Sequence, residues 1–124
     1  MHTSYFGNIK NLPKGKTVAI SQGVPGWYKG QRFLELAPSW DIVRLADPDT
    51  FNQCYAAILA KLTPGRTYET IEAMVGGGAI LLCWEKPGEF CHRRIVAQWF
   101  EDTIGIQVPE YERLQPSLLL DGAG

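Results

Sequence analysis

Residues suited to chemistry are concentrated between positions 85 and 93 of the chain. Glu85 and Glu89 carry carboxylates that suit a general base, and the thiol of Cys91 suits a nucleophile. His92 and Arg93 follow directly, and an imidazole beside a guanidinium suits the binding of an anion. We therefore take Cys91, Glu85 and Glu89 as candidate catalytic residues, and His92 and Arg93 as candidate ligand-binding residues.

The same residues have simpler structural explanations, and these stay open. Glu89 lies four residues before Arg93, a spacing at which an ion pair would balance the arginine without any ligand. Cys91 lies four residues before Ile95 and shares its apolar stripe, where a free cysteine is often a small buried hydrophobe. A catalytic dyad of Cys91 and His92 is disfavoured, because adjacent residues of a helix point about 100° apart.

The elements around these residues predict a site at the edge of a sheet. Residues 79–84 are continuously apolar, which is typical of a parallel strand that is covered on both faces. A helix over about residues 90–104 follows, with Gly105 as its C-cap. Ligands of open α/β sheets bind beyond the carboxyl ends of the strands, and the N-terminus of a helix attracts anions. The candidate residues lie where this strand ends and this helix begins.

The remaining patterns predict the fold class. Asp47 and Pro48 suit the N-cap and first position of a helix that Pro64 and Gly65 end. A second helix is expected over residues 67–75, ended by three consecutive glycines, and short strands over residues 1–6 and 17–20. This order indicates an α/β fold: one small domain over residues 1–124, with a mostly parallel sheet flanked by helices and a loosely held C-terminus.

Six more candidate ligand-binding residues belong to segments that should reach the same edge of the sheet. They are Ser4, Tyr5, Ser21, Gln22, Trp27 and Tyr28. Trp27 and Tyr28 follow the strand at 17–20 in a loop and could stack on a base or ring, although aromatic packing of the loop explains them equally simply. Ser4 and Tyr5 end the first strand, so we expect them to line the same cleft.

Other site classes fail on spacing or context. The sequence Gly15-Lys16-Thr17 resembles the end of a P-loop, but it lacks the upstream glycine and precedes a strand instead of a helix. Cys83 and Cys91 are too far apart for the usual paired zinc ligands, and only Cys54 and His2 remain as distant partners. We therefore expect no bound metal and no cofactor.

Composition limits the partners and the compartment. Hydrophobic residues make up 45% and charged residues 20% of the chain, the balance of an ordinary globular domain. The formal net charge of −1 argues against a dedicated duplex-DNA binder, whereas single-stranded nucleic acid is possible but not favoured. No targeting segment and no apolar run of membrane-spanning length is present. Three cysteines are a poor disulfide framework, which indicates a reduced, cytoplasmic protein without a membrane partner.

Several stretches of the chain together resemble a known family. They are residues 3–8, 20–25, 36–39 and 81–94, and the run from Glu85 to Arg94 is the most specific of them. The chain is similar to the bacterial and phage family called "domain of unknown function 488". The resemblance implies a compact α/β domain and supports Cys91, His92 and Arg93 as a site, but it implies no reaction. Gln22 occupies a position that is often basic in the family, which weakens an anion site shared with that loop.

These patterns favour one function and leave two others open. The favoured hypothesis is that the protein binds, or acts on, an anionic nucleotide-like or phosphorylated small molecule at the carboxyl edge of the sheet. The alternative is a non-catalytic module that binds protein or nucleic acid through its aromatic residues, Trp27, Tyr28, Trp40 and Trp84. Thiol-redox or metal chemistry at Cys83 and Cys91 is less favoured. The sequence determines neither the oligomeric state nor whether the protein is an enzyme.

Overall fold

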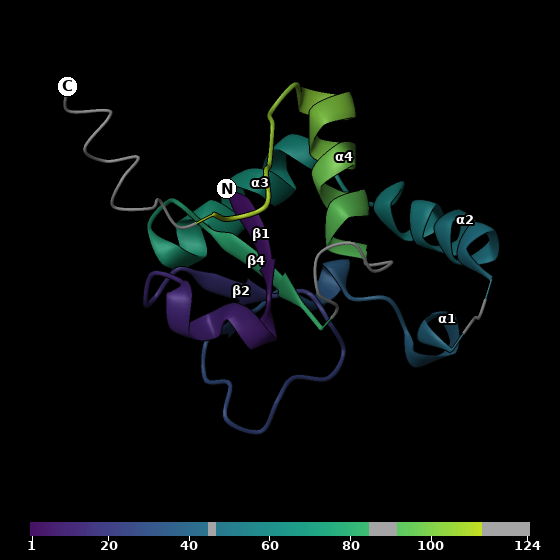
Figure 1. Cartoon of the computed structure of the whole chain (residues 1–124). Helices are drawn as coiled ribbons and strands as arrows, with labels where there is room; N and C mark the ends of the chain where they lie inside the picture. Colours follow the sequence, from purple (N-terminus) through teal and green to yellow (C-terminus); the bar gives the residue numbers. More distant parts are fainter. Residues whose placement is uncertain (45–46, 85–91, 113–124) are drawn as a thin grey trace.

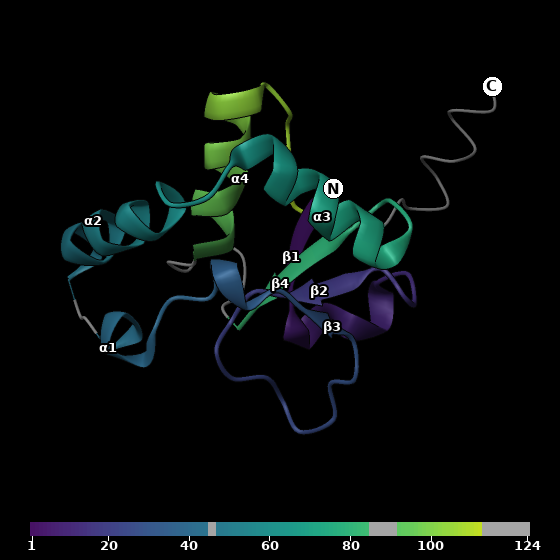
Figure 2. The same cartoon turned by 180° about the vertical axis from the view of Figure 1, so that it is seen from behind.

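The centre of the molecule is a four-stranded, entirely parallel sheet (Figure 1). The computed structural model describes residues 1–44, 47–84 and 92–112. The strand order is β1-β4-β2-β3. The strands are β1 (His2–Tyr5), β2 (Thr17–Ala19), β3 (Gln31–Arg32) and β4 (Ile80–Cys83). This confirms the predicted α/β class and three of the strands, whereas the two-residue edge strand β3, seen beside β2 in Figure 2, was not predicted.

The helices begin largely where their capping residues predict. They are η1 (Phe6–Asn11), η2 (Leu34–Leu36), α1 (Trp40–Val43), α2 (Pro48–Leu59), α3 (Pro64–Val75) and α4 (His92–Ile104). The side chain of Asp47 accepts from the amide of Asp49 and caps α2, as expected. The expected start of α3 at residue 67 is wrong, because Pro64 occupies the first turn of that helix. A proline that stops one helix is equally suited to begin the next.

The sheet separates two hydrophobic clusters. Val18, Ile20 and Leu81 point to one face and pack against the α-helices. Ala19 and Leu82 point to the other face, where η1 and the loop before β3 cover them. This alternation follows from the two-residue period of a strand, and it explains why the run at 79–84 is apolar throughout.

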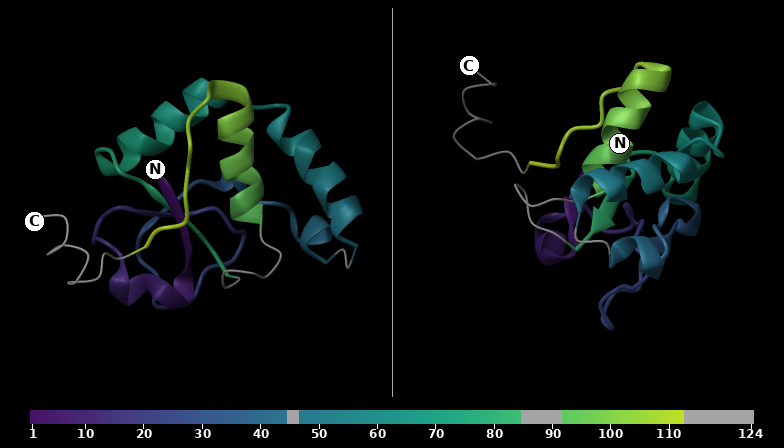
Figure 3. Two further views of the ribbon diagram at one scale, coloured as in Figure 1. Left: turned by 45° about the horizontal axis from the view of Figure 1, so that its top comes forward. Right: turned by 90° about the vertical axis from the view of Figure 1, so that its right-hand side faces the viewer.

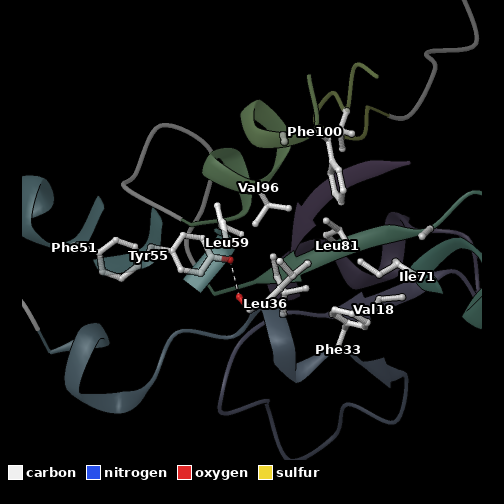
Figure 4. Close-up of a cluster of buried hydrophobic side chains, with 14 residues drawn as sticks. Val18, Phe33, Leu36, Phe51, Tyr55, Leu59, Ile71, Leu81, Val96 and Phe100 are labelled. Carbon is white, nitrogen blue, oxygen red and sulfur yellow. Dashed lines mark hydrogen bonds between the residues drawn. The ribbon is translucent and has the colours of Figure 1, made fainter. Parts of the chain in front are cut away.

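One buried hydrogen bond joins α2 to η2 (Figure 4). The hydroxyl of Tyr55, whose side chain is fully buried, donates to the carbonyl oxygen of Leu36 at 2.6 Å. The ring of Tyr55 also packs against Phe51 and against His92, at the start of α4. The position of α2 is therefore linked directly to the beginning of α4.

We expect Tyr55→Phe to lower the free energy of unfolding by about 2 kcal/mol, because the carbonyl oxygen of Leu36 would stay buried without its donor. Urea denaturation of the two proteins measures this difference. Tyr68→Phe is the control, because Tyr68 packs on Phe100 and its hydroxyl group forms no hydrogen bond with a described residue. Equal losses in both variants would show that the hydrogen bond to Leu36 contributes nothing specific.

Lys16 has a structural partner that accounts for the P-loop resemblance. Its Nζ donates to the carbonyl oxygens of Val75 and Gly77, both at 2.9 Å, and so caps the C-terminus of α3. Gly76 takes the left-handed conformation (φ +71°) that ends this helix. Thr17 begins β2, so the strand predicted after Gly15-Lys16-Thr17 is confirmed.

The segment after α4 returns along the outer edge of β1 (Figure 3). The amide of Thr3 donates to the carbonyl oxygen of Pro109, and the amide of Tyr111 donates to that of Thr3. Glu110, between them, forms an isolated parallel bridge with Thr3. This pairing, which was not predicted, brings the carboxylate of Glu110 to the sheet. Within the described part of the chain, no helix is long and apolar enough to cross a bilayer.

Candidate functional site

Arg93 lies near the carboxyl edge of the sheet, on the face that α4 covers. Only 1% of its surface is exposed. Its Nε donates to Oε1 of Glu110 at 2.7 Å, and its Nη1 donates to Sγ of Cys83 at 3.1 Å. The guanidinium also lies 5.9 Å from the centre of the Tyr5 ring. Arg93 therefore connects α4 with β1, β4 and the C-terminal segment, and its carboxylate partner is one that spacing along the sequence did not indicate.

Arg94, at the next position of α4, also binds β1. Its Nη1 donates to Oγ1 of Thr3 and to the carbonyl oxygen of Val108, both at 2.8 Å. Two arginines in the first turn of a helix are unfavourable for the helix dipole. Their contacts with Glu110, Thr3 and Val108 offset that cost within the protein itself.

His92 joins the start of α4 to the end of β2. Its Nε2 lies 2.6 Å from the carbonyl oxygen of Ile20. A carbonyl only accepts, so Nε2 carries the hydrogen and Nδ1 is the unprotonated nitrogen of the neutral ring. Burial is the largest cause that lowers the pKa of His92 to about 4; the hydrogen bond to Ile20 raises it, and the charge of Arg93 lowers it. His92 is therefore neutral near pH 7 and holds the two elements together.

The candidate catalytic residues Glu85, Glu89 and Cys91 lie outside the described residues. Cys83 is fully buried in β4 and is disulfide-bonded. The expectation of a fully reduced chain is wrong in this structure for Cys83, while Cys54 is a free thiol. Within the described ranges, no three His, Cys, Asp or Glu residues lie close enough to hold a metal ion.

Ser4 and Tyr5 do not line one cleft, because adjacent residues of a strand point to opposite faces. Ser4 pairs in register with Leu82, and its buried Oγ accepts from Nδ2 of Asn8 in η1. Tyr5 pairs with Cys83 and lies near Arg93 on the other face. Only Tyr5 therefore joins the cluster around Arg93.

Ser21, Gln22 and Gly23 form a turn at the carboxyl end of β2, and the turn organises the surface of this edge. The buried hydroxyl of Ser21 donates to the carbonyl oxygen of Gly23 at 2.7 Å. Nε1 of Trp84, the residue after β4, donates to the same oxygen at 2.9 Å. Arg32, at the end of β3, donates to the carbonyl oxygen of Gln22. A guanidinium and an indole are thus fixed on successive carbonyl groups of one turn.

A second tryptophan reaches this turn from α1. A Cβ added to Gly23 would lie 3.1 Å from the ring of Trp40, so the absence of a side chain permits the close approach. Trp40 and Trp84 remain 53% and 51% exposed. Among the described residues, Arg32 has no carboxylate within salt-bridge distance. Arg32 was not among the predicted site residues, because its position depends on the unpredicted strand β3.

Trp27 and Tyr28 lie on the other side of the sheet from the Arg93 cluster. The hydroxyl of Tyr28 donates to the carbonyl oxygen of Gln31 at 2.7 Å and lies 3.2 Å from Oγ1 of Thr17, the first residue of β2. The loop therefore turns back toward the amino end of β2 after leaving its carboxyl end. Of the predicted loop residues, the structure brings Ser21 and Gln22 to the carboxyl edge and takes Tyr28 away from it.

Comparison with known proteins adds the family. A model of the family described as "Domain of unknown function DUF488" matches residues 28–100, which is more than half of the chain. The matched region includes Arg32, Trp40, Trp84, His92 and Arg93. Searches of curated proteins and of solved structures found no match. The chain belongs to the DUF488 family.

Proposed function

We propose that this protein binds an anionic, nucleotide-like or phosphorylated small molecule at the carboxyl edge of its sheet. The observation that carries the proposal is the turn at residues 21–23, where the guanidinium of Arg32 and the half-exposed indole of Trp84 bind adjacent carbonyl groups. A guanidinium recognises phosphate or carboxylate through several donors at once. An exposed indole stacks on bases and other rings. Together they suit a ligand that combines a charged group with a ring.

The surroundings of this turn support the same ligand class. Trp40 supplies a second half-exposed ring next to Gly23. The carboxyl edge of a parallel sheet is the usual place for such ligands in α/β folds. Arg93 is ion-paired with Glu110, so in this proposal it stabilises the carboxyl edge without contacting the ligand. Arg32 is the cation that binds the ligand. Any chemical transformation of the ligand would fall to Glu85 or Glu89, which lie outside the described residues.

The test is a titration with nucleoside monophosphates, a sugar phosphate and inorganic phosphate, followed through the indole resonances of the protein. We expect a nucleoside monophosphate to shift the Trp84 resonance. We expect Arg32→Ala to weaken its binding about tenfold or more, because a charge-assisted hydrogen bond is worth about 1.5 to 3 kcal/mol. Trp84→Ala should weaken it by about 1 to 3 kcal/mol through lost stacking, and Trp84→Phe should restore part of the loss.

Arg44→Ala is the matched control for Arg32→Ala, because Arg44 is an exposed arginine whose one ion pair with a described residue is a loose contact with Asp41 at 4.0 Å. It should leave the affinity unchanged. The proposal fails if no member of the panel shifts Trp84, or if the Arg32 and Arg44 variants bind equally well. Arg93→Ala is a poor probe, because removal of a buried, ion-paired arginine would disturb the fold itself.

Single-stranded nucleic acid is a second candidate ligand, because three tryptophans are about half exposed: Trp27, Trp40 and Trp84. Aromatic platforms bind successive bases without needing a large net positive charge. A short single-stranded oligonucleotide should then bind more tightly than a mononucleotide, and its affinity should fall as the salt concentration rises. Equal affinity for both ligands would favour the small molecule.

A further inference from the structure

A cavity of about 760 Å³ opens on the side of the sheet that η1 covers, near the amino ends of β2 and β3. The residues that line it include Leu12 and Lys14, which follow η1, and Trp27, Tyr28 and Lys29, which precede β3. None of the described residues that line it belongs to the Arg93 cluster or to the turn at residues 21–23. Its volume falls in the range of small-molecule sites.

One wall of the cavity is a fixed aromatic surface. Tyr28 is buried, and its hydroxyl is hydrogen-bonded to Thr17 of β2 and to Gln31 of the neighbouring strand β3. Trp27 packs edge-on against Tyr28 with 6.4 Å between ring centroids, yet 53% of its surface is exposed. The exposed part of an anchored indole can stack on a planar ligand with little loss of conformational entropy.

The charged side chains among the described lining residues are all positive. Lys14 and Lys29 line it, and no Asp or Glu is among its described lining residues. Neither ammonium group forms a hydrogen bond or ion pair with a described residue, whereas Lys16, close by in sequence, is fully engaged with the end of α3. Two unpartnered cations beside an aromatic wall suit a ligand that is both anionic and planar.

We propose that this cavity is a second binding site, which takes a small aromatic anion, meaning a planar ring that carries a carboxylate, sulfonate or phosphate. Trp27 stacks on the ring, and Lys14 and Lys29 balance the charge. The apolar body of the ligand covers Leu12 and the ring of Tyr28. The site does not depend on the function proposed for the carboxyl edge.

The test uses 2-naphthoate as the probe and nitrogen-15 spectra of the whole chain, with the Trp27 indole signal assigned through Trp27→Phe. The expected result is a saturable shift of the Trp27 signal that is larger than any shift of Trp84, which packs on the same Phe6 ring, and an unchanged Trp40 signal. The double variant Lys14→Ala, Lys29→Ala should raise Kd about tenfold, because each exposed ion pair contributes up to about fivefold. The control with Lys10→Ala and Lys61→Ala removes two exposed lysines that do not line the cavity, and it should bind normally.

Two analogues separate the parts of the recognition. Neutral 2-naphthylmethanol tests the charge and cyclohexanecarboxylate tests the ring, and both should bind about tenfold more weakly than 2-naphthoate. Equal binding of either analogue, or an unchanged Kd in the variant that lacks Lys14 and Lys29, would overturn the proposal. Shifts of Trp40 and Trp84 without Trp27 would also overturn it, while leaving the proposed function of the carboxyl edge intact.

Discussion

Acid should destabilise this protein well above the pH at which most carboxylates titrate, and His92 should be the cause. Its folded-state pKa is about 4, against 6.5 for an unperturbed histidine. Between these values the unfolded chain binds a proton that the folded protein excludes. The stabilising contribution is therefore complete above pH 6.5 and is lost as the pH falls toward 4. Between pH 7 and pH 5 the loss should be about 2 kcal/mol, and it should reach about 3 kcal/mol at pH 4 and below.

The physical reason is the environment of the imidazole. His92 is buried against Tyr55 and lies next to the cation Arg93, so both desolvation and charge oppose protonation. The Nε2 hydrogen bond to Ile20 only partly compensates. The folded protein keeps the ring neutral and so avoids the free-energy cost of burying a charged imidazolium, but it loses stability in acid for the same reason.

Urea denaturation at pH 7 and pH 5 measures the effect. His92→Gln should be less stable at pH 7, because it loses the packed ring, but its stability should change much less between the two pH values. His2→Gln is the control, because the pKa of His2 is lowered as well. Its partial burial is the main cause, and the N-terminal ammonium group is the second. If the pH dependence disappears in the His2 variant and persists in the His92 variant, this assignment is wrong.

Breaking the ion pair between Arg93 and Glu110 should produce the second large effect. We expect Glu110→Gln to reduce the free energy of unfolding by about 3 kcal/mol. This is the lower end of the loss expected when a buried ion pair is broken, because the side chain of Glu110 is still 26% exposed. The reason is that Arg93 is 1% exposed and would be left with a less complete set of acceptors for its charge. In a chain of this size the melting temperature should fall by about 10 °C.

Glu112→Gln is the control, because Glu112 is an exposed carboxylate two residues away, and its loss should change stability by less than about 0.5 kcal/mol. A double variant, Arg93→Met with Glu110→Met, should recover much of the loss, because it removes both charges and keeps the packed volume. If Glu110→Gln is as stable as Glu112→Gln, the ion pair does not hold the C-terminal segment against β1.

The two effects bear on function through the same edge of the sheet. His92 and Arg93 connect the start of α4 to Ile20, Cys83 and Glu110. Ile20 directly precedes the turn in which Gln22 and Gly23 hold Arg32 and Trp84. Variants of His92 or Glu110 should therefore weaken ligand binding at the carboxyl edge together with stability, whereas Arg32→Ala should affect binding alone.

Local patterns along the chain were sufficient for much of the fold. The N-cap at Asp47, the left-handed glycine after Val75 and the apolar run before Trp84 each depend on neighbouring residues only, and each element was predicted from them. The parallel arrangement followed from the order of strands and helices. The family resemblance was also visible in local runs of sequence, and the match over residues 28–100 confirms it.

The partners of the candidate residues were decided only by the tertiary structure. Glu110 lies far from β1 in sequence but pairs with Thr3 and meets Arg93, and no periodicity connects those positions. Arg32 lies in a two-residue strand, which is too short to show any alternation, and its place beside Trp84 depends on the pairing of β3 with β2. Capping and alternation are properties of adjacent residues, whereas ion pairs and ligand sites join segments that only chain folding brings together. The sequence alone therefore determined the elements and the edge of the sheet to inspect, and the packing of β3 and the C-terminal segment decided which charges are engaged there and which remain available.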